Sequence, residues 1–169
     1  MSETNPKFKV SIDGVEVEVD PGTTILNAAR LIGGDVVPPA MCYYSSLQGS
    51  GGKCRTCLVE VSKGSEKDPR PMPKLVASCS TPIMDGMEVK NKTSEKVIEA
   101  RAGVVEMLLI NHPLDCPICD QGGECDLQDQ AFKYGKGRSR YSENKRSVKD
   151  KNLGPLVATH MTRCIQDRK

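Results

Sequence analysis

Cysteines at metal-binding spacing are the residues of this sequence with the most specific chemistry. The first group holds four of the eight cysteines, two of them in a Cys-x-x-Cys pair: Cys42, Cys54, Cys57 and Cys79. A tight turn brings sulfurs at positions i and i+3 together, so this pair can bind one metal centre. The preceding residues 48–53 are rich in glycine, which lets the backbone wrap closely and aim N–H groups at an anionic centre. The group predicts an iron–sulfur cluster with four thiolate ligands or, alternatively, a structural zinc site.

The second group combines one histidine with three cysteines in a single looping segment: His112, Cys116, Cys119 and Cys125. Such a segment can supply all four ligands of one centre. If the centre is a [4Fe–4S] cluster, replacing one thiolate with neutral imidazole removes a negative charge and should raise its reduction potential. A zinc site with three cysteines and one histidine is the alternative.

Composition limits the size and the compartment of the protein. The chain has 169 residues, of which 37% are hydrophobic and none is Trp, so we expect one or two small domains with modest cores. The N-terminus lacks the apolar region of a secretory signal, and the longest apolar run, residues 40–44, is far too short to cross a membrane. We therefore expect a reducing compartment, in which Cys-x-x-Cys spacing indicates metal or redox chemistry rather than disulfides.

Charge gives no argument for nucleic-acid binding. The formal net charge is only +2. A basic stretch runs from Lys133 to Lys151, but aromatic residues are scarce beside it. We expect this stretch to be a solvated face of the protein rather than a nucleic-acid interface.

The first ninety or so residues predict a mixed sheet with one helix. Alternating apolar residues over 8–12 and 15–19 flank Asp13-Gly14, which is a strong hairpin signal. A helix should follow, capped by Thr23 or Thr24 and ended by Gly33-Gly34. Further short strands are predicted at 58–61, 75–77 and 87–89. This order predicts an α+β fold with the helix packed on one face of the sheet.

A separate unit is predicted to begin at Thr93. Thr93 or Ser94 can cap a helix whose apolar residues recur at helical spacing as far as Ile110, before His112-Pro113 ends it. From Leu114 to about Gln130 the sequence is typical of a loop, and beyond it the periodicity fades.

The segment from Asn111 to Asp129 closely resembles the His-Cys₃ segment of the large iron–sulfur subunit of respiratory complex I. This is the 75-kDa type of subunit of NADH–quinone oxidoreductase. The resemblance extends upstream through Gly52–Val61 and Val76–Pro82, and downstream through Lys151–Val157 and Met161–Gln166. It covers nearly the whole sequence, and it favours iron–sulfur clusters over zinc at both groups.

The resemblance implies a division of the chain into three parts. Residues 1–92 would form a ferredoxin-like β-grasp domain whose [2Fe–2S] cluster is held by Cys42, Cys54, Cys57 and Cys79. Residues 93–133 would form a small helical and loop domain whose [4Fe–4S] cluster is held by His112, Cys116, Cys119 and Cys125. Residues 134–169 would hold the basic stretch and the truncated start of a further iron–sulfur domain.

The sequence departs from the family pattern in two ways. The gaps from Cys42 to Cys54 and from Cys57 to Cys79 are longer than usual, but lengthening a surface loop costs little free energy. The family also continues past the position of Cys164 with a Cys-x-x-Cys-x-x-Cys run for another [4Fe–4S] cluster, whereas here the next ligand position holds Asp167. We therefore expect that cluster to be absent, the chain to be a truncated or split version of the subunit, and Cys164 to be a free thiol.

The resemblance implies an electron-transfer subunit of NADH:quinone oxidoreductase, the proton-translocating respiratory complex I. It would relay single electrons from an NADH-binding flavoprotein subunit toward quinone, among other peripheral-arm subunits, on the cytoplasmic side of the bacterial inner membrane without inserting into it. No catalytic side chain is expected, and no Gly-x-Gly-x-x-Gly motif suited to a dinucleotide is present. The alternatives are the electron-input subunit of an NAD-linked hydrogenase or formate dehydrogenase, and a zinc-stapled interaction module without redox function.

Overall fold

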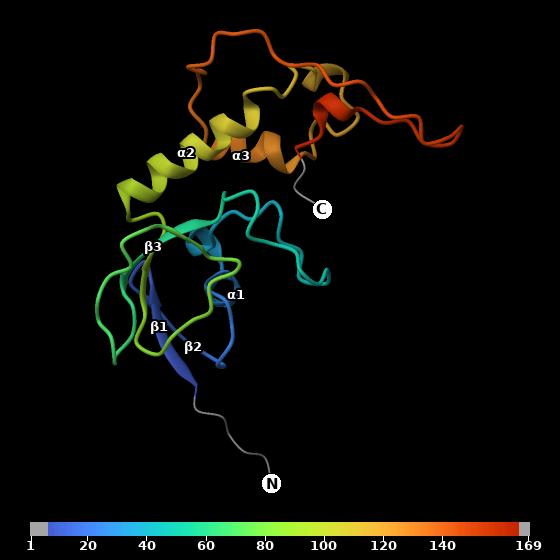
Figure 1. Ribbon diagram of the computed structural model, residues 1–169. Coiled ribbons are helices and arrows are strands. Elements are labelled where there is room, and N and C mark those ends of the chain that lie inside the picture. The colour runs from blue at the N-terminus through green and yellow to red at the C-terminus, as the bar shows by residue number, and fades with distance from the viewer. Residues whose placement is uncertain (1–6, 166–169) are drawn as a thin grey trace. The chain divides into compact units, whose positions relative to one another are not determined.

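A five-stranded sheet forms the first part of the protein (Figure 1). The computed structural model describes residues 7–165. The strands are β1 (Phe8–Ile12), β2 (Val15–Val19), β3 (Leu58–Lys63), β4 (Val76–Ala77) and β5 (Glu88–Lys90). Their order is β2-β1-β5-β3-β4, with β1 and β5 parallel and the other neighbours antiparallel. The mixed sheet and the positions of its strands agree with the sequence prediction to within one or two residues.

The hairpin of β1 and β2 turns at Asp13-Gly14, as predicted. Both residues have positive φ, 50° and 84°, which suits the right-handed twist of the flanking strands. The carboxylate of Asp13 also accepts hydrogen bonds from the chain before the second helix: from the N–H of Asn91 at 2.8 Å and from the hydroxyl of Thr93 at 2.6 Å. This contact ties the first turn of the sheet to a segment almost eighty residues later in the sequence.

Helix α1 (Ile25–Ile32) covers one face of the sheet. Thr24 caps it, since its hydroxyl accepts a hydrogen bond from the N–H of Asn27, and Gly33 ends it at a φ of 79°. Ile25, Ala28 and Ala29 are buried against the strands. The core they share with the sheet consists of Val10, Ile12, Val19, Val59, Val61, Ile83, Met87 and Val89. The predicted helix and its limits are confirmed.

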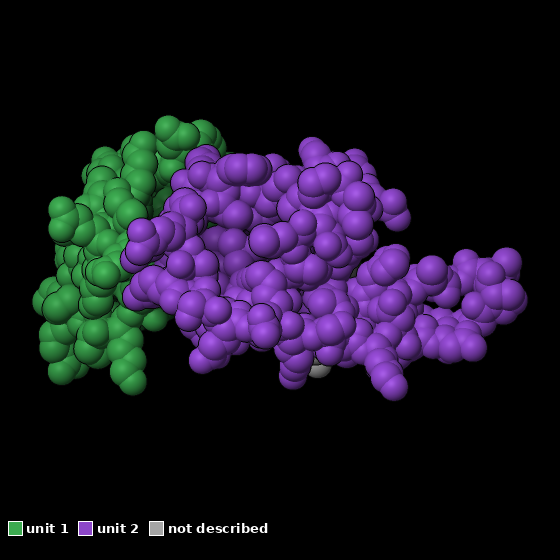
Figure 2. Space-filling view, turned by 90° about the horizontal axis from the view of Figure 1, so that it is seen from above, with its two compact units in different colours: residues 1–101, 169 green, residues 102–168 purple. Residues whose placement is uncertain are grey.

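The protein consists of two compact units (Figure 2). Unit 1 ends at Arg101, and unit 2 begins at Ala102. Helix α2 (Glu95–Leu109) begins in unit 1 and continues into unit 2. The backbone N–H of Val97, in the first turn of α2, donates a hydrogen bond of 3.4 Å to the hydroxyl oxygen of Ser94. Within unit 1, the buried Arg101 donates hydrogen bonds to the carbonyl oxygens of Thr56 and Leu58, both at 3.0 Å.

The prediction of a loop from Leu114 to about Gln130 is wrong for the last residues of this range. Helix α3 (Asp126–Tyr134) begins within it and ends before Gly135, whose N–H bonds to the carbonyl of Ala131. Leu127 is its only residue that is buried, so the apolar stripe is too short to give a clear period. Two carboxylates in its first turn, those of Asp126 and Asp129, favour the helix through its dipole.

The rest of unit 2 lacks α-helix and strand among the described residues. Short 3₁₀ helices lie at η2 (Cys116–Ile118) and η3 (Met161–Arg163). Between α3 and η3 the chain extends into a long arm, drawn orange to red in Figure 1. Among residues 7–165 no helix has both the length and the apolar character needed to cross a membrane.

Candidate metal centres

The four cysteines of the first group lie together in unit 1, and all four are buried. Cys42 comes from the loop after α1, Cys54 and Cys57 from the turn before β3, and Cys79 from the residues after β4. The sulfurs of Cys57 and Cys79 are 3.4 Å apart, and the backbone N–H of Cys54 donates to Cys42 Sγ at 3.3 Å. The cysteines therefore form two neighbouring pairs.

Paired cysteines suit a centre that contains two metal ions. A [2Fe–2S] cluster takes two protein ligands on each iron. The donor set in unit 1, with two pairs of sulfurs, fits this cluster.

Backbone N–H groups of the glycine-rich loop point at these sulfurs. Gly52 donates to Cys79 Sγ at 3.1 Å, and Lys53 and Cys54 donate to Cys42 Sγ, each at 3.3 Å. A Cβ on Gly51, whose φ is 100°, would lie only 3.3 Å from Cys79 Sγ. The loop can approach the sulfurs this closely because it has no side chain there, as the glycines of the sequence predicted. Its N–H groups stabilise negative charge on the thiolates.

In each cysteine pair the pKa of one thiol is raised and the pKa of the other is lowered. Cys57 donates to Cys79, and this bond together with burial raises the pKa of Cys57. Accepting the same bond, and one from Gly52, lowers the pKa of Cys79 to about 7 despite burial. Burial also raises the pKa of Cys42, whereas the pKa of Cys54 is lowered because hydrogen bonds from Thr56 outweigh burial. Since metal ligands must be thiolates, loading this site releases protons.

Unit 2 brings the four residues of the second group to the wall of one cavity of about 240 Å³. Cys116 opens the 3₁₀ helix η2, and Cys125 immediately precedes α3. Between them Gly122 packs so tightly that a Cβ would lie 2.7 Å from the carbonyl oxygen of Cys116. Most of the remaining wall is apolar and comes from Leu109, Pro113, Leu127, Ala131 and Phe132.

The imidazole of His112 is suited to bind a metal in its neutral form. Its Nδ1 is buried and has no hydrogen-bond partner among the described residues, which is costly unless a ligand satisfies it. Burial lowers the pKa of His112, and the nearby charges of Lys145 and Arg163 lower it further, against an opposing effect of Asp115. One nitrogen and three sulfurs around an apolar cavity fit a [4Fe–4S] cluster with one histidine ligand.

Sequence reasoning did not find the charged residues beside this cavity. Arg163 lines it and forms an ion pair with Asp115 at 3.3 Å. Every lysine and arginine of the stretch from Lys133 to Lys151 is exposed, as predicted, and Lys145 also donates to backbone carbonyls at the end of α2. Cys164 is exposed and forms no disulfide. Asp167 lies outside the described residues.

A small α+β domain with two pairs of buried cysteines, followed by a cavity lined by one histidine and three cysteines, defines an iron–sulfur protein with two centres. Residues 5–94 match the family described as "2Fe-2S iron-sulfur cluster binding domain", and residues 101–140 match the "NADH-ubiquinone oxidoreductase-G iron-sulfur binding region". The chain belongs to the family of 2Fe–2S iron–sulfur cluster binding domains. Its cofactors are a [2Fe–2S] and a [4Fe–4S] cluster, as predicted.

Curated relatives agree with the predicted resemblance. The G subunits of NADH-quinone oxidoreductase from Rickettsia bellii and Rickettsia typhi are each 55% identical to this chain over 159 residues, and that of Rickettsia prowazekii is 54% identical. Each alignment covers 94% of this chain and 22% of the relative, so the chain spans about a fifth of the length of these relatives.

A solved structure agrees with the fold. The crystal structure of NAD+-reducing [NiFe]-hydrogenase in the H2-reduced state superposes with a TM-score of 0.78 at 28% sequence identity. The match covers 95% of this chain and 62% of that chain. The predicted α+β fold is confirmed.

Proposed function

We propose that this chain carries the electron-relay function of an iron–sulfur subunit of NADH–quinone oxidoreductase. In this proposal it passes single electrons from an NADH-oxidising flavoprotein subunit toward quinone. The observation that carries the proposal is the His-Cys₃ cavity of unit 2, whose one histidine and three cysteines lie within the region matching the iron–sulfur binding region of NADH–ubiquinone oxidoreductase-G. Its relatives at 54–55% identity bear the name of the G subunit of NADH-quinone oxidoreductase, which supports the same assignment.

We propose that Cys42, Cys54, Cys57 and Cys79 hold the [2Fe–2S] cluster and that His112, Cys116, Cys119 and Cys125 hold the [4Fe–4S] cluster. When bound, the clusters supply reversible one-electron chemistry. The protein itself contributes positioning and environment. In unit 1, Leu26 and Ala77 pack around Cys57 and Cys79 and exclude water, while the loop N–H groups hold the thiolates. No side chain need act as acid, base or nucleophile.

The proposed domains are residues 1–92 for the [2Fe–2S] cluster, 93–133 for the [4Fe–4S] cluster, and 134–169 for the basic stretch and the start of a further iron–sulfur region. The family matches over residues 5–94 and 101–140 support the first two. The proposed partners are the flavoprotein subunit and other peripheral-arm subunits. The proposed location is the cytoplasmic side of the bacterial inner membrane, without insertion.

A second candidate function is electron input to an NAD-linked hydrogenase. The superposition on the NAD+-reducing [NiFe]-hydrogenase supports it, but at 28% identity against 54–55% for the relatives from NADH-quinone oxidoreductase. Affinity purification of the tagged chain from its own cells separates the two candidates. Recovery of quinone-reducing subunits would favour the first function, and recovery of a nickel-containing subunit would favour the second.

Anaerobic reconstitution with iron and sulfide tests the cluster content on which both candidates depend. We expect about six irons per chain, from one [2Fe–2S] and one [4Fe–4S] cluster, and two distinct EPR signals after reduction. A colourless protein that binds two zinc ions and gives no EPR signal would overturn the proposal in favour of a zinc-stapled module.

A further inference from the structure

The chain after α3 folds back onto the loop that carries His112. Lys145 Nζ donates to the carbonyl oxygens of Leu109 at 2.8 Å and Ile110 at 3.0 Å, at the end of α2. The N–H of Arg146 donates to the side-chain oxygen of Asn111 at 3.0 Å. Beyond His112, Arg163 donates to Asp115 Oδ2 from Nη2 at 3.3 Å. We call residues 145–163 the strap, and its two ends grip the loop on either side of His112.

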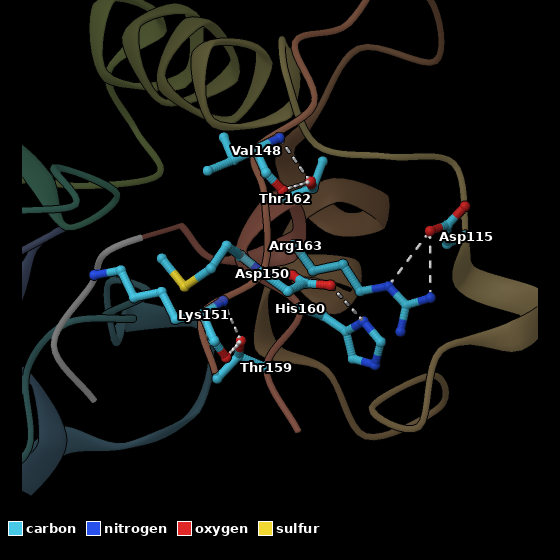
Figure 3. A network of polar contacts seen from close by, with 9 residues as sticks. Asp115, Val148, Asp150, Lys151, Thr159, His160, Thr162 and Arg163 are labelled. Carbon is cyan, nitrogen blue, oxygen red and sulfur yellow. Dashed lines mark hydrogen bonds and ion pairs between the residues drawn. The ribbon is translucent and has the colours of Figure 1, made fainter. Parts of the chain in front are cut away.

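The strap is braced internally, so its two ends are held in a fixed relation (Figure 3). Val148 and Thr162 exchange two hydrogen bonds of 3.0 and 3.1 Å through the threonine hydroxyl, and Lys151 and Thr159 do the same at 2.9 Å. The N–H of Met161 adds a bond of 2.7 Å to a carboxylate oxygen of Asp150. These bonds join residues 148–151 of the strap to residues 159–162, and they therefore hold the backbone of Arg163 in place.

Arg163 differs from an ordinary surface arginine in its surroundings. Its side chain is only 20% exposed, and it lines the same cavity as His112 and Cys116. Its partner Asp115 immediately precedes Cys116. A salt bridge in this position restricts the segment that joins His112 to Cys116, and a positive charge in a partly buried site is screened less than one in water.

We propose that Arg163 is a positioning residue for the [4Fe–4S] centre: its ion pair with Asp115 fixes the segment between His112 and Cys116, and its charge raises the reduction potential of the cluster. The inference rests on the proposed function, because it takes these residues as ligands. A nearby cation stabilises the added electron, and net charge is one of the means by which a protein sets the potential of an iron–sulfur cluster.

The test is a set of variants titrated by EPR in the reconstituted chain. Arg163→Met should shift the equilibrium between the reduced and oxidised [4Fe–4S] cluster about tenfold toward the oxidised form. For one electron this is a fall of about 59 mV in the reduction potential. Arg163→Lys, which keeps the charge, should recover most of the potential but not the line shape of the signal. Asp115→Asn with Arg163→Met removes both charges, so its potential should return toward that of the unaltered chain. Arg70→Met is the matched control, because Arg70 pairs with Asp68 within unit 1.

The outcomes separate this inference from the proposed function. If the unaltered chain forms no [4Fe–4S] cluster, the proposed function fails. If it forms the cluster, and Arg163→Met leaves both the potential and the line shape unchanged, the inference alone is overturned. If the Arg163→Met chain takes up only the [2Fe–2S] cluster, the positioning role is tested by hydrogen exchange of residues 109–116, measured in the cluster-free forms of both chains. Faster exchange than in the unaltered chain supports the positioning role, and equal exchange overturns it.

Discussion

The sulfur atoms of Cys57 and Cys79 lie 3.4 Å apart although 22 positions separate them in the sequence. Cys57 lies directly before β3 and Cys79 two residues after β4, and these two strands are antiparallel neighbours. The pairing of these two strands therefore brings together two sulfurs that a long loop separates in the sequence.

Replacing Cys79 should remove the [2Fe–2S] cluster and leave the other. In Cys79→Ser, a hydroxyl that does not ionise near neutral pH replaces a thiol whose pKa is about 7. We expect the iron content to fall by about two per chain and the [2Fe–2S] EPR signal to disappear. Cys164→Ser is the matched control, because Cys164 is exposed and outside both ligand sets, and it should keep both signals. Retention of the [2Fe–2S] signal in Cys79→Ser would contradict the ligand assignment.

Replacing His112 with cysteine should lower the potential of the [4Fe–4S] cluster. A thiolate adds a negative charge where a neutral imidazole stood, so the reduced state becomes less favourable. An EPR-monitored redox titration measures the shift, and pulsed EPR should show the loss of a nitrogen coupling. An unchanged nitrogen coupling in His112→Cys would mean that His112 is not a ligand.

Gly51→Ala should destabilise unit 1 and weaken its cluster site. The residue has a φ of 100°, which an L side chain rarely adopts, and the new Cβ would press on Cys79 Sγ. We expect a loss of about 1–3 kcal/mol in unfolding free energy, measured by urea titration, together with poorer reconstitution of the [2Fe–2S] cluster. Gly103→Ala is the control. Gly103 lies inside α2 with open space around it, so this change should stabilise the protein by about 0.5–1 kcal/mol.

Asp13→Asn should lower the free energy of unfolding at neutral pH and change it little in acid. Burial tends to raise the pKa of Asp13, but hydrogen bonds from Thr93, Asn91 and Lys92 outweigh it and lower the pKa below its ordinary value. A carboxylate with a lowered pKa stabilises the folded state above its unfolded pKa, and this contribution is lost as the pH falls through the folded pKa. Asparagine tolerates the positive φ at this position, so the change removes the charge with little backbone strain.

Urea titrations of the unaltered and Asp13→Asn chains between pH 7 and pH 3 measure this effect. We expect a difference of about 1 kcal/mol at pH 7, since the carboxylate is only partly buried. Both chains lose iron in acid, so the quantity compared is the difference between their unfolding free energies at each pH. A difference that stayed constant down to pH 3 would show that the charge of Asp13 has no role.

Local signals in the sequence explain why most of the fold could be predicted. Asp13-Gly14 specifies its turn through the φ values that these residues tolerate, and Thr24 and Gly33 mark the ends of α1. Likewise, the spacing of cysteines within one turn or one loop identified the candidate ligands. Each of these signals is contained within a few neighbouring residues.

The remainder depends on contacts that no local pattern encodes. Helix α3 has a single buried residue, Leu127, so its period was too weak to recognise. The ion pair of Asp115 and Arg163 joins residues 48 positions apart, and neither has neighbours that mark it as special. Arg55, between Cys54 and Cys57, has a positive φ of 63°, which no preference of arginine predicts.

The place of β5 in the sheet has a consequence for the order of events on the ribosome. Of the five strands of this sheet β5 is the last to be synthesised, yet it lies at the centre of the sheet, between β1 and β3. Until residues 88–90 have emerged, the chain holds only two separate hairpins, β1 with β2 and β3 with β4. All four cysteines of unit 1 are therefore translated before the scaffold around them can close, and we expect iron to be delivered to this domain only after the central strand has left the exit tunnel.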